Sequence, residues 1–164
     1  HPTNRRQRQM CIRDSIYLGS NKLHRSLNQG DEWEAISEDL TKGAKKGNVP
    51  YGTLTAIDES RDAFGTLVVG SDDGLIHLTQ NSGTTWRCVS DNLPQDLWVS
   101  RVQFSQHDPS RIYATLNGYR WDDFTPYVYV SNDLGASWTD ISSNLPKSAV
   151  NVIREDATLS LIHI

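Results

Sequence analysis

The residues best suited to chemistry lie in one short stretch, Tyr119–Asp123, which holds two aromatic side chains, an arginine and two carboxylates. Such a mixture suits a sugar ring, because the ring stacks on an aromatic face while its hydroxyls hydrogen-bond to charged groups. A tryptophan and an arginine at the start of a strand expected nearby would approach the same face. The candidate ligand-binding residues are Trp98, Arg101, Tyr119, Arg120, Trp121, Asp122 and Asp123.

Hydrolysis of a glycosidic bond would need two carboxylates on opposite sides of that bond. Asp122 and Asp123 are adjacent in the chain, so their side chains are expected to diverge. Either could act only with a carboxylate from another part of a larger protein, and the catalytic residues stay unassigned. The alternative interpretation is an insertion loop, residues 117–126, that packs on its own aromatic side chains.

The elements that would position these residues are short strands. Residues 54–60, 66–71, 75–80 and 85–90 form four runs rich in β-branched or aromatic residues, separated by turn residues. The next unit repeats the four runs as WVSRVQFS, RIYATL, YVYVS and SWTDIS. No ten-residue stretch has the apolar stripe of a helix. The sequence therefore predicts an all-β protein.

Three tryptophans reveal an internal repeat. Trp33, Trp86 and Trp138 recur at intervals of 53 and 52 residues. A period near 50 with four short strands is typical of a β-propeller blade. The sequence predicts a β-propeller fragment with about two full four-stranded blades, at residues 53–93 and 97–145. Partial blades are expected on either side: a part-blade holding the third and fourth strands (16–40), and the first strand of a fourth blade.

Each tryptophan ends an Asp-box motif, S-x-D-x-G-x-[ST]-W. The third copy, Ser131–Trp138, matches every defined position, whereas the second has Thr79 and Asn81, and the first has Glu32 in place of Ser or Thr. The box locks a hairpin turn, since Asp or Asn accepts backbone hydrogen bonds and glycine supplies a positive φ. We expect these residues to be structural and the tryptophans to be largely buried. The structural set is Ser26, Asn28, Gly30, Trp33, Thr79, Asn81, Gly83, Thr85, Trp86, Ser131, Asp133, Gly135, Ser137 and Trp138.

The two ends of the chain differ from the rest. Residues 1–15 and 159–164 are predicted to be non-native, adapter-derived sequence, which leaves residues 16–158 as the propeller fragment. Residues 1–14 and 159–164 are expected to pack against nothing. Leaving out residues 1–15 removes four basic residues and one acidic residue, so the net charge moves from −4 to −7. An acidic chain argues against a nucleic-acid partner. Cys88 is then the only cysteine, and the sequence predicts no disulfide, cofactor, metal site or membrane segment.

Residues 16–158 also resemble a narrower family. The segments 51–60, 69–86, 97–138 and 151–156 are similar to bacterial BNR-repeat "glycosyl hydrolase" proteins, which are related to the sortilin/Vps10 propeller and to xyloglucanase-type propellers. The resemblance implies an extracytoplasmic bacterial protein of seven or more blades that binds carbohydrate or is related to glycoside hydrolases. A non-enzymatic propeller that binds a polypeptide, or a purely structural module, stays open, because fold-level analogy does not assign chemistry. The expected partners are a glycan or polypeptide ligand and the remaining blades of a larger chain.

Overall fold

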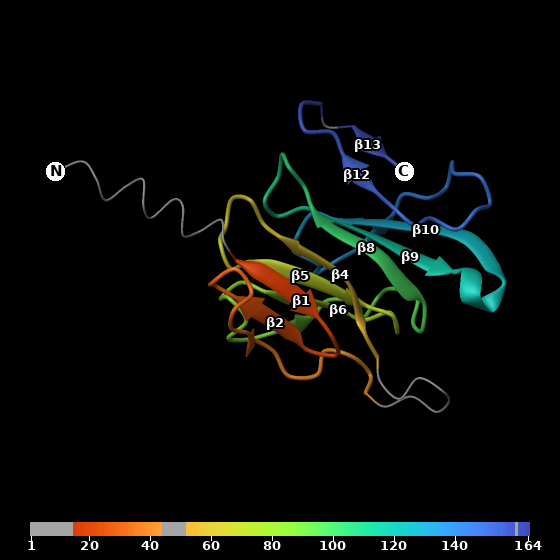
Figure 1. Cartoon of the computed structure of the whole chain (residues 1–164). Coiled ribbons are helices and arrows are strands. Elements are labelled where there is room, and N and C mark those ends of the chain that lie inside the picture. The colour runs from red at the N-terminus through yellow and green to blue at the C-terminus, as the bar shows by residue number, and fades with distance from the viewer. Residues whose placement is uncertain (1–14, 44–51, 160) are drawn as a thin grey trace.

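The computed structural model describes residues 15–43, 52–159 and 161–164 of the chain, and it is built from strands (Figure 1). One short 3-10 turn, η1 (Tyr119–Trp121), interrupts them. The strands are β1 (Ile16–Gly19), β2 (Leu23–Ser26), β3 (Glu34–Ala35), β4 (Leu54–Glu59), β5 (Leu67–Ser71), β6 (Ile76–Thr79), β7 (Arg87–Cys88), β8 (Trp98–Phe104), β9 (Ile112–Gly118), β10 (Asp123–Ser131), β11 (Thr139–Asp140), β12 (Arg154–Glu155) and β13 (Ile162–His163).

The strands form four antiparallel sheets that follow one another along the chain. Strands β4 to β7 make one four-stranded meander and β8 to β11 make a second. The three-stranded sheet β1–β3 precedes them and the pair β12–β13 follows. We call these sheets blades 1 to 4, and we label the strands of a complete blade A to D in chain order. The predicted propeller-blade architecture is confirmed, although blade 1 supplies three strands where the sequence predicted two.

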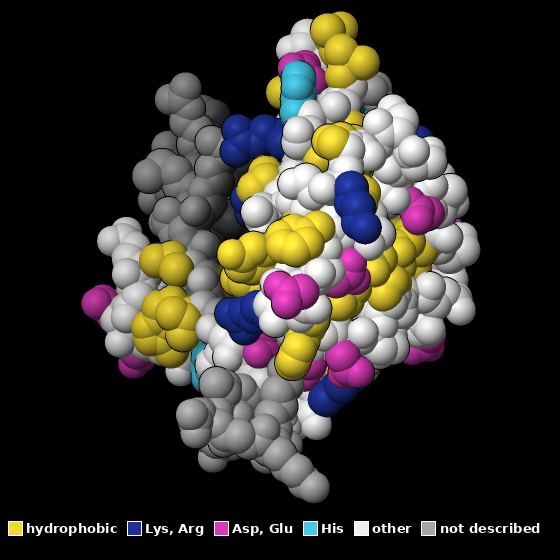
Figure 2. All heavy atoms as spheres, turned by 90° about the vertical axis from the view of Figure 1, so that its right-hand side faces the viewer, with side chains coloured by type: hydrophobic (Ala, Val, Ile, Leu, Met, Phe, Trp, Pro, Cys, Tyr) yellow, Lys and Arg dark blue, Asp and Glu magenta, His cyan; other side chains and the backbone are white. Residues whose placement is uncertain are grey.

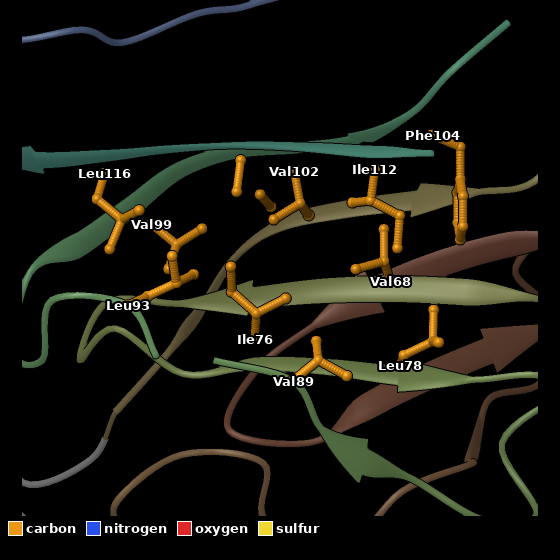
Figure 3. Packing of buried hydrophobic residues seen from close by; sticks show 12 residues of the cluster. Val68, Ile76, Leu78, Val89, Leu93, Val99, Val102, Phe104, Ile112 and Leu116 are labelled. Carbon is orange, nitrogen blue, oxygen red and sulfur yellow. The ribbon is translucent and has the colours of Figure 1, made fainter. Parts of the chain in front are cut away.

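The hydrophobic core lies between successive blades. The largest cluster joins Val68 and Ile76 of blade 2 to Val102 and Ile112 of blade 3, and each of the four is at most 1% exposed (Figure 3). Two smaller clusters fill the spaces between blades 1 and 2 and between blades 3 and 4. Strands β5 and β9 are buried along their whole length because a neighbouring blade covers each face. Stability therefore depends on contacts between blades more than on any single sheet.

A repeated hydroxyl contact ties the inner strands together. The Oγ1 of Thr55 donates to the carbonyl oxygen of Val99 at 2.6 Å, and the Oγ of Ser100 donates to that of Val150 at 2.9 Å. Both hydroxyls lie at a register irregularity near the start of strand A. Thr55 and Ser100 thus occupy equivalent positions, and Val150 lies just before β12, the inner strand of blade 4.

Each Asp box forms the hairpin between strands C and D. In the third box the Oδ1 of Asp133 accepts from the Oγ of Ser131 at 2.7 Å and from the backbone N–H of Ser137 at 2.8 Å. In the first box, Glu32 takes the place of the usual hydroxyl, and the Nδ2 of Asn28 donates to its Oε2 at 3.4 Å. The amide of Asn81 in the second box donates to Thr85 Oγ1 in the same way, at 2.9 Å. The carboxylate of Glu32 therefore compensates for the missing hydroxyl.

Asp133 is the one titratable residue at its box position, because the other two boxes carry asparagine there. Hydrogen bonds from Ser137, followed by one from Ser131, lower the pKa of Asp133 from 3.8 to about 2. A lowered folded-state pKa means that the contribution to stability is complete above pH 3.8 and is lost as the pH falls through about 2. Asp133→Asn should keep the hairpin, as Asn81 does, but remove this dependence. Urea midpoints of both forms from about pH 6 to about pH 2 test this: the stability advantage of Asp133 should shrink with acidification, and parallel curves would contradict it.

The box tryptophans contact the preceding blade. The indole Nε1 of Trp86 donates to the carbonyl oxygen of Ile36 at 3.0 Å, and that of Trp138 donates to the carbonyl oxygen of Val89 at 2.6 Å. These equivalent contacts fit the predicted repeat. Trp86 and Trp138 are mostly buried, as expected, whereas the expectation is wrong for the tryptophan of the first box. Trp33 is 43% exposed, since no described blade lies before it.

The C-terminal residues also differ from the expectation. Ile162 and His163 pair with Glu155 and Arg154 to form blade 4, and the N–H of Asp156 donates to the carbonyl oxygen of Leu161 at 2.8 Å. The prediction that the C-terminal end packs against nothing is therefore wrong for Ile162 and His163, because they occupy the place of strand B. Their non-native origin stays a prediction. The other predicted non-native end falls mostly on residues 1–14, which lie outside the described residues.

Candidate functional site

The connection between β9 and β10 is shorter than the predicted loop 117–126. Strand β9 ends at Gly118, η1 follows, and β10 already begins at Asp123, which pairs with Gly118. An irregularity in the pairing separates Asp123 from Tyr127, where the sequence predicted the strand to start. Asp122 closes η1 in the left-handed conformation, with φ 56°. The turn therefore places the aromatic residues on a short 3-10 element between two paired strands.

Three of the predicted residues surround one pocket. The guanidinium carbon of Arg120 lies 4.6 Å from the ring centroid of Trp98, which is a cation–π geometry. Together with Tyr119 they line a pocket of about 390 Å³. Asn117, Ala149 and Asn151 complete the lining. The volume lies within the usual range for a small-ligand site.

Sequence reasoning missed the two asparagines of this pocket. The Nδ2 of Asn117 donates to the Oδ1 of Asn151 at 2.5 Å, and the N–H of Tyr119 donates to the Oδ1 of Asn117 at 2.7 Å. Asn151 belongs to blade 4 and occupies the position of Thr55 and Ser100 in the repeat. An alignment of the strand A segments would have found it. The two amides hold η1 against the neighbouring blade.

Exposed aromatic side chains extend the pocket outward. Tyr119 is 64% exposed and Trp121 is 72% exposed. The rings of Tyr119 and Phe124 meet edge to face, with centroids 5.7 Å apart. Figure 2 views the molecule from the side of η1 and shows hydrophobic side chains gathered beside Lys or Arg and Asp or Glu side chains. Trp121 does not line the pocket but stands next to it in η1.

The two carboxylates do not form a hydrolytic pair. The Oδ2 of Asp123 accepts from the hydroxyl of Tyr127 at 2.7 Å, and its Oδ1 accepts from the N–H of Thr125 at 2.9 Å. Hydrogen bonds from Thr125 and then Tyr127 lower the pKa of Asp123 below its usual value. Asp123 is therefore ionised at neutral pH and cannot serve as a general acid. In the described part of the chain, no carboxylate lines the pocket.

Arg101 lies elsewhere. Arg101 does not line the pocket of Trp98, because three residues along an extended strand carry it about 10 Å away. Arg101 instead lines a second cavity with Arg61 and Arg154.

Within residues 15–43, 52–159 and 161–164, no helix is long and apolar enough to cross a membrane. In the same residues, no group of three or more histidine, cysteine, aspartate or glutamate side chains is arranged to hold a metal ion.

The sheets and their hairpins define the chain as a set of β-propeller blades, and solved structures of propeller proteins match it. A GH74 enzyme from Niastella koreensis superposes with a TM-score of 0.59 and 16% identity, covering 80% of this chain and 20% of that one. YCF48 bound to the D1 peptide superposes with a TM-score of 0.53 and 13% identity, covering 79% of this chain and 36% of that one. The chain thus spans only a part of either protein. No protein-family model and no curated protein sequence matches it.

Proposed function

We propose that this chain is part of an extracytoplasmic BNR-type propeller of a bacterium that binds carbohydrate, and that the pocket beside η1 contacts the sugar. The observation that carries the proposal is the stacking of Arg120 on Trp98 at a pocket edged by the exposed ring of Tyr119. The likeness to a GH74 enzyme supports the propeller fold. The resemblance of the sequence to BNR-repeat proteins supports the ligand class and the location.

The geometry favours a sugar for two physical reasons. Tyr119 and Trp121 present broad apolar faces that are not consumed by the blade core, so a ring can stack on them. Arg120 stacks on Trp98 and forms no ion pair with any described residue, so its N–H groups can donate to hydroxyls. Binding rather than hydrolysis is proposed for these residues. Glycosidase activity in a larger protein would need carboxylates from other blades.

Tyr119→Ala and Trp121→Ala should each weaken oligosaccharide binding by about 1–2 kcal/mol, roughly the value of one aromatic contact. Neither change should alter the unfolding midpoint, because both side chains are mostly exposed. The matched control is Phe64→Ala, since Phe64 is 53% exposed but lies in the A–B turn at the other end of its blade. Calorimetric titration against a panel of oligosaccharides measures the affinities.

Equal affinity in the wild type and in both η1 variants would contradict the proposal. So would saturable binding of peptides, but of no oligosaccharide, that is lost in Tyr119→Ala. That result would support the alternative of a non-enzymatic propeller that binds a polypeptide.

A further inference from the structure

A second cavity, of about 550 Å³, lies along the inner strands of blades 3 and 4. Three arginines line it, and each comes from a different blade: Arg61 from blade 2, Arg101 from blade 3 and Arg154 from blade 4. Arg61 belongs to an A–B turn. In an antiparallel meander the A–B and C–D turns share one end, so this cavity opens away from the end that carries η1.

The repeat itself does not require these arginines. The N–H groups of Ser60, Ser105 and Asp156 each close an A–B turn in the same way, which fixes the alignment of the blades. In this alignment Arg61 corresponds to Gln106 and Ala157, Arg101 corresponds to Ala56 and Val152, and Arg154 corresponds to Asp58 and Gln103. The blade scaffold thus accepts uncharged or acidic residues at all three positions. The three arginines therefore line one cavity although the blade fold does not require an arginine at any of their positions.

Among the described residues, these guanidinium groups also lack close anionic partners. Arg101 and Arg154 make no side-chain hydrogen bond or ion pair there, and Arg61 donates only to the neutral Oε1 of Gln106, at 3.1 Å. By contrast, Arg25 pairs with Glu34, and Arg111 lies 3.6 Å from the carboxylate of Asp108. Guanidinium groups that form no ion pair keep N–H donors available for an anionic ligand.

One carboxylate that lines the cavity already accepts several hydrogen bonds. Glu155 is 1% exposed, and its Oε2 accepts from the Oγ of Ser105 at 2.7 Å and from the N–H of Gln106 at 2.5 Å. Its Oε1 accepts from the hydroxyl of Tyr113 at 3.0 Å. Burial raises the pKa of Glu155, but these hydrogen bonds outweigh it and lower the pKa overall. The carboxylate therefore stays inside the blade interface and makes no ion pair with the three arginines.

Two further carboxylates face the cluster. The Oδ1 of Asp156 accepts from the N–H groups of Thr158 and Leu159, and its Oδ2 lies 3.9 Å from the Nε2 of His163. Asp58 is held by the N–H of Phe104 at 2.7 Å, and burial raises its pKa although Arg61 and Arg101 act in the opposite direction. Each carboxylate thus accepts hydrogen bonds from backbone N–H groups.

We propose that this cavity binds an oxyanion, either the carboxylate or the phosphate group of an acidic ligand. Planar guanidinium groups from three blades can each present a fork of N–H donors to such a group, and charge-assisted hydrogen bonds of this kind are the strong ones. The proposal rests on the three arginines and not on His163. It is independent of the carbohydrate proposal, because the two pockets lie at opposite ends of the blades.

Titration of the protein with citrate and with inorganic phosphate by isothermal calorimetry at low salt tests the proposal. At least one probe should bind saturably, and Arg101→Gln and Arg154→Gln should each weaken that binding about tenfold, the equivalent of one charge-assisted hydrogen bond. Affinity should fall as sodium chloride is added. Preference for citrate would identify a carboxylate ligand, and preference for phosphate would identify a phosphate ligand.

The matched control is Arg87→Gln, which removes the same charge from the outermost strand of blade 2. It should bind either probe within about twofold of the wild type. No saturable binding of either probe would overturn the proposal, and so would an equal loss in all three variants, because that result reports only net charge. Arg101 and Arg154 are exposed, so both variants should unfold at the wild-type midpoint.

Discussion

Replacing Trp86 with alanine is expected to lower the free energy of unfolding by about 3 kcal/mol, near the lower limit for truncating a large core aromatic. The indole packs against the cluster between blades 1 and 2, and its Nε1 donates to the carbonyl oxygen of Ile36 at 3.0 Å. The change would remove apolar contact and leave that carbonyl without this donor. Denaturant unfolding followed by circular dichroism measures the loss.

Two further variants separate the causes. Trp86→Phe keeps most of the ring but removes the indole N–H, so it should cost about 1 kcal/mol, the value of one hydrogen bond. Trp33→Ala is the matched control, because Trp33 holds the same position in its Asp box but is 43% exposed and contacts no preceding blade among the described residues. Its loss should cost less than about 1 kcal/mol. Equal effects at Trp33 and Trp86 would show that the tryptophan stabilises its own hairpin rather than the junction between blades.

The blades could be predicted from the sequence because each blade repeats the same pattern of residues. Trp33, Trp86 and Trp138 occupy the same position in each repeat, and turn residues separate the stretches that form strands. The role of the tryptophan was harder to predict. Its partner is a backbone carbonyl, such as that of Val89 for Trp138, and a carbonyl has no signature in the sequence.

The candidate site was predictable only in part. Trp98, Tyr119 and Arg120 come together because β8, β9 and η1 are close in the chain and belong to one blade. Asn151 and the cluster of Arg61, Arg101 and Arg154 come from different blades. Contacts of this kind depend on the angle between sheets and on the local irregularity that follows Val99. Neither the angle between sheets nor this irregularity can be predicted from the hydrophobic pattern of a single strand.

The junction between blades 2 and 3 offers the other large effect. Gly70 lies within strand β5, where a glycine commonly marks a close approach of another strand. A Cβ added there would lie 2.9 Å from the Cβ of Val99 and closer still to its Cγ1. Val99 is fully buried, so it has little room to move away. Gly70→Ala should therefore lower the free energy of unfolding by about 2–3 kcal/mol through overpacking.

A double-mutant cycle isolates this contact. Val99→Ala alone should cost about 2 kcal/mol, because it leaves a cavity in the core. In the double variant the new methyl group of residue 70 would fill part of that cavity, so the combined loss should fall short of the sum by about 1–2 kcal/mol. Gly19 approaches Leu54 in the same manner between blades 1 and 2, because a Cβ added to Gly19 would lie 2.9 Å from the Cβ of Leu54. Gly19→Ala should therefore destabilise the protein for the same reason. If the losses in free energy of unfolding of Gly70→Ala and Val99→Ala simply add, the two residues do not interact across the junction. The glycine would then be needed for the conformation of β5 rather than for the close approach of the two blades.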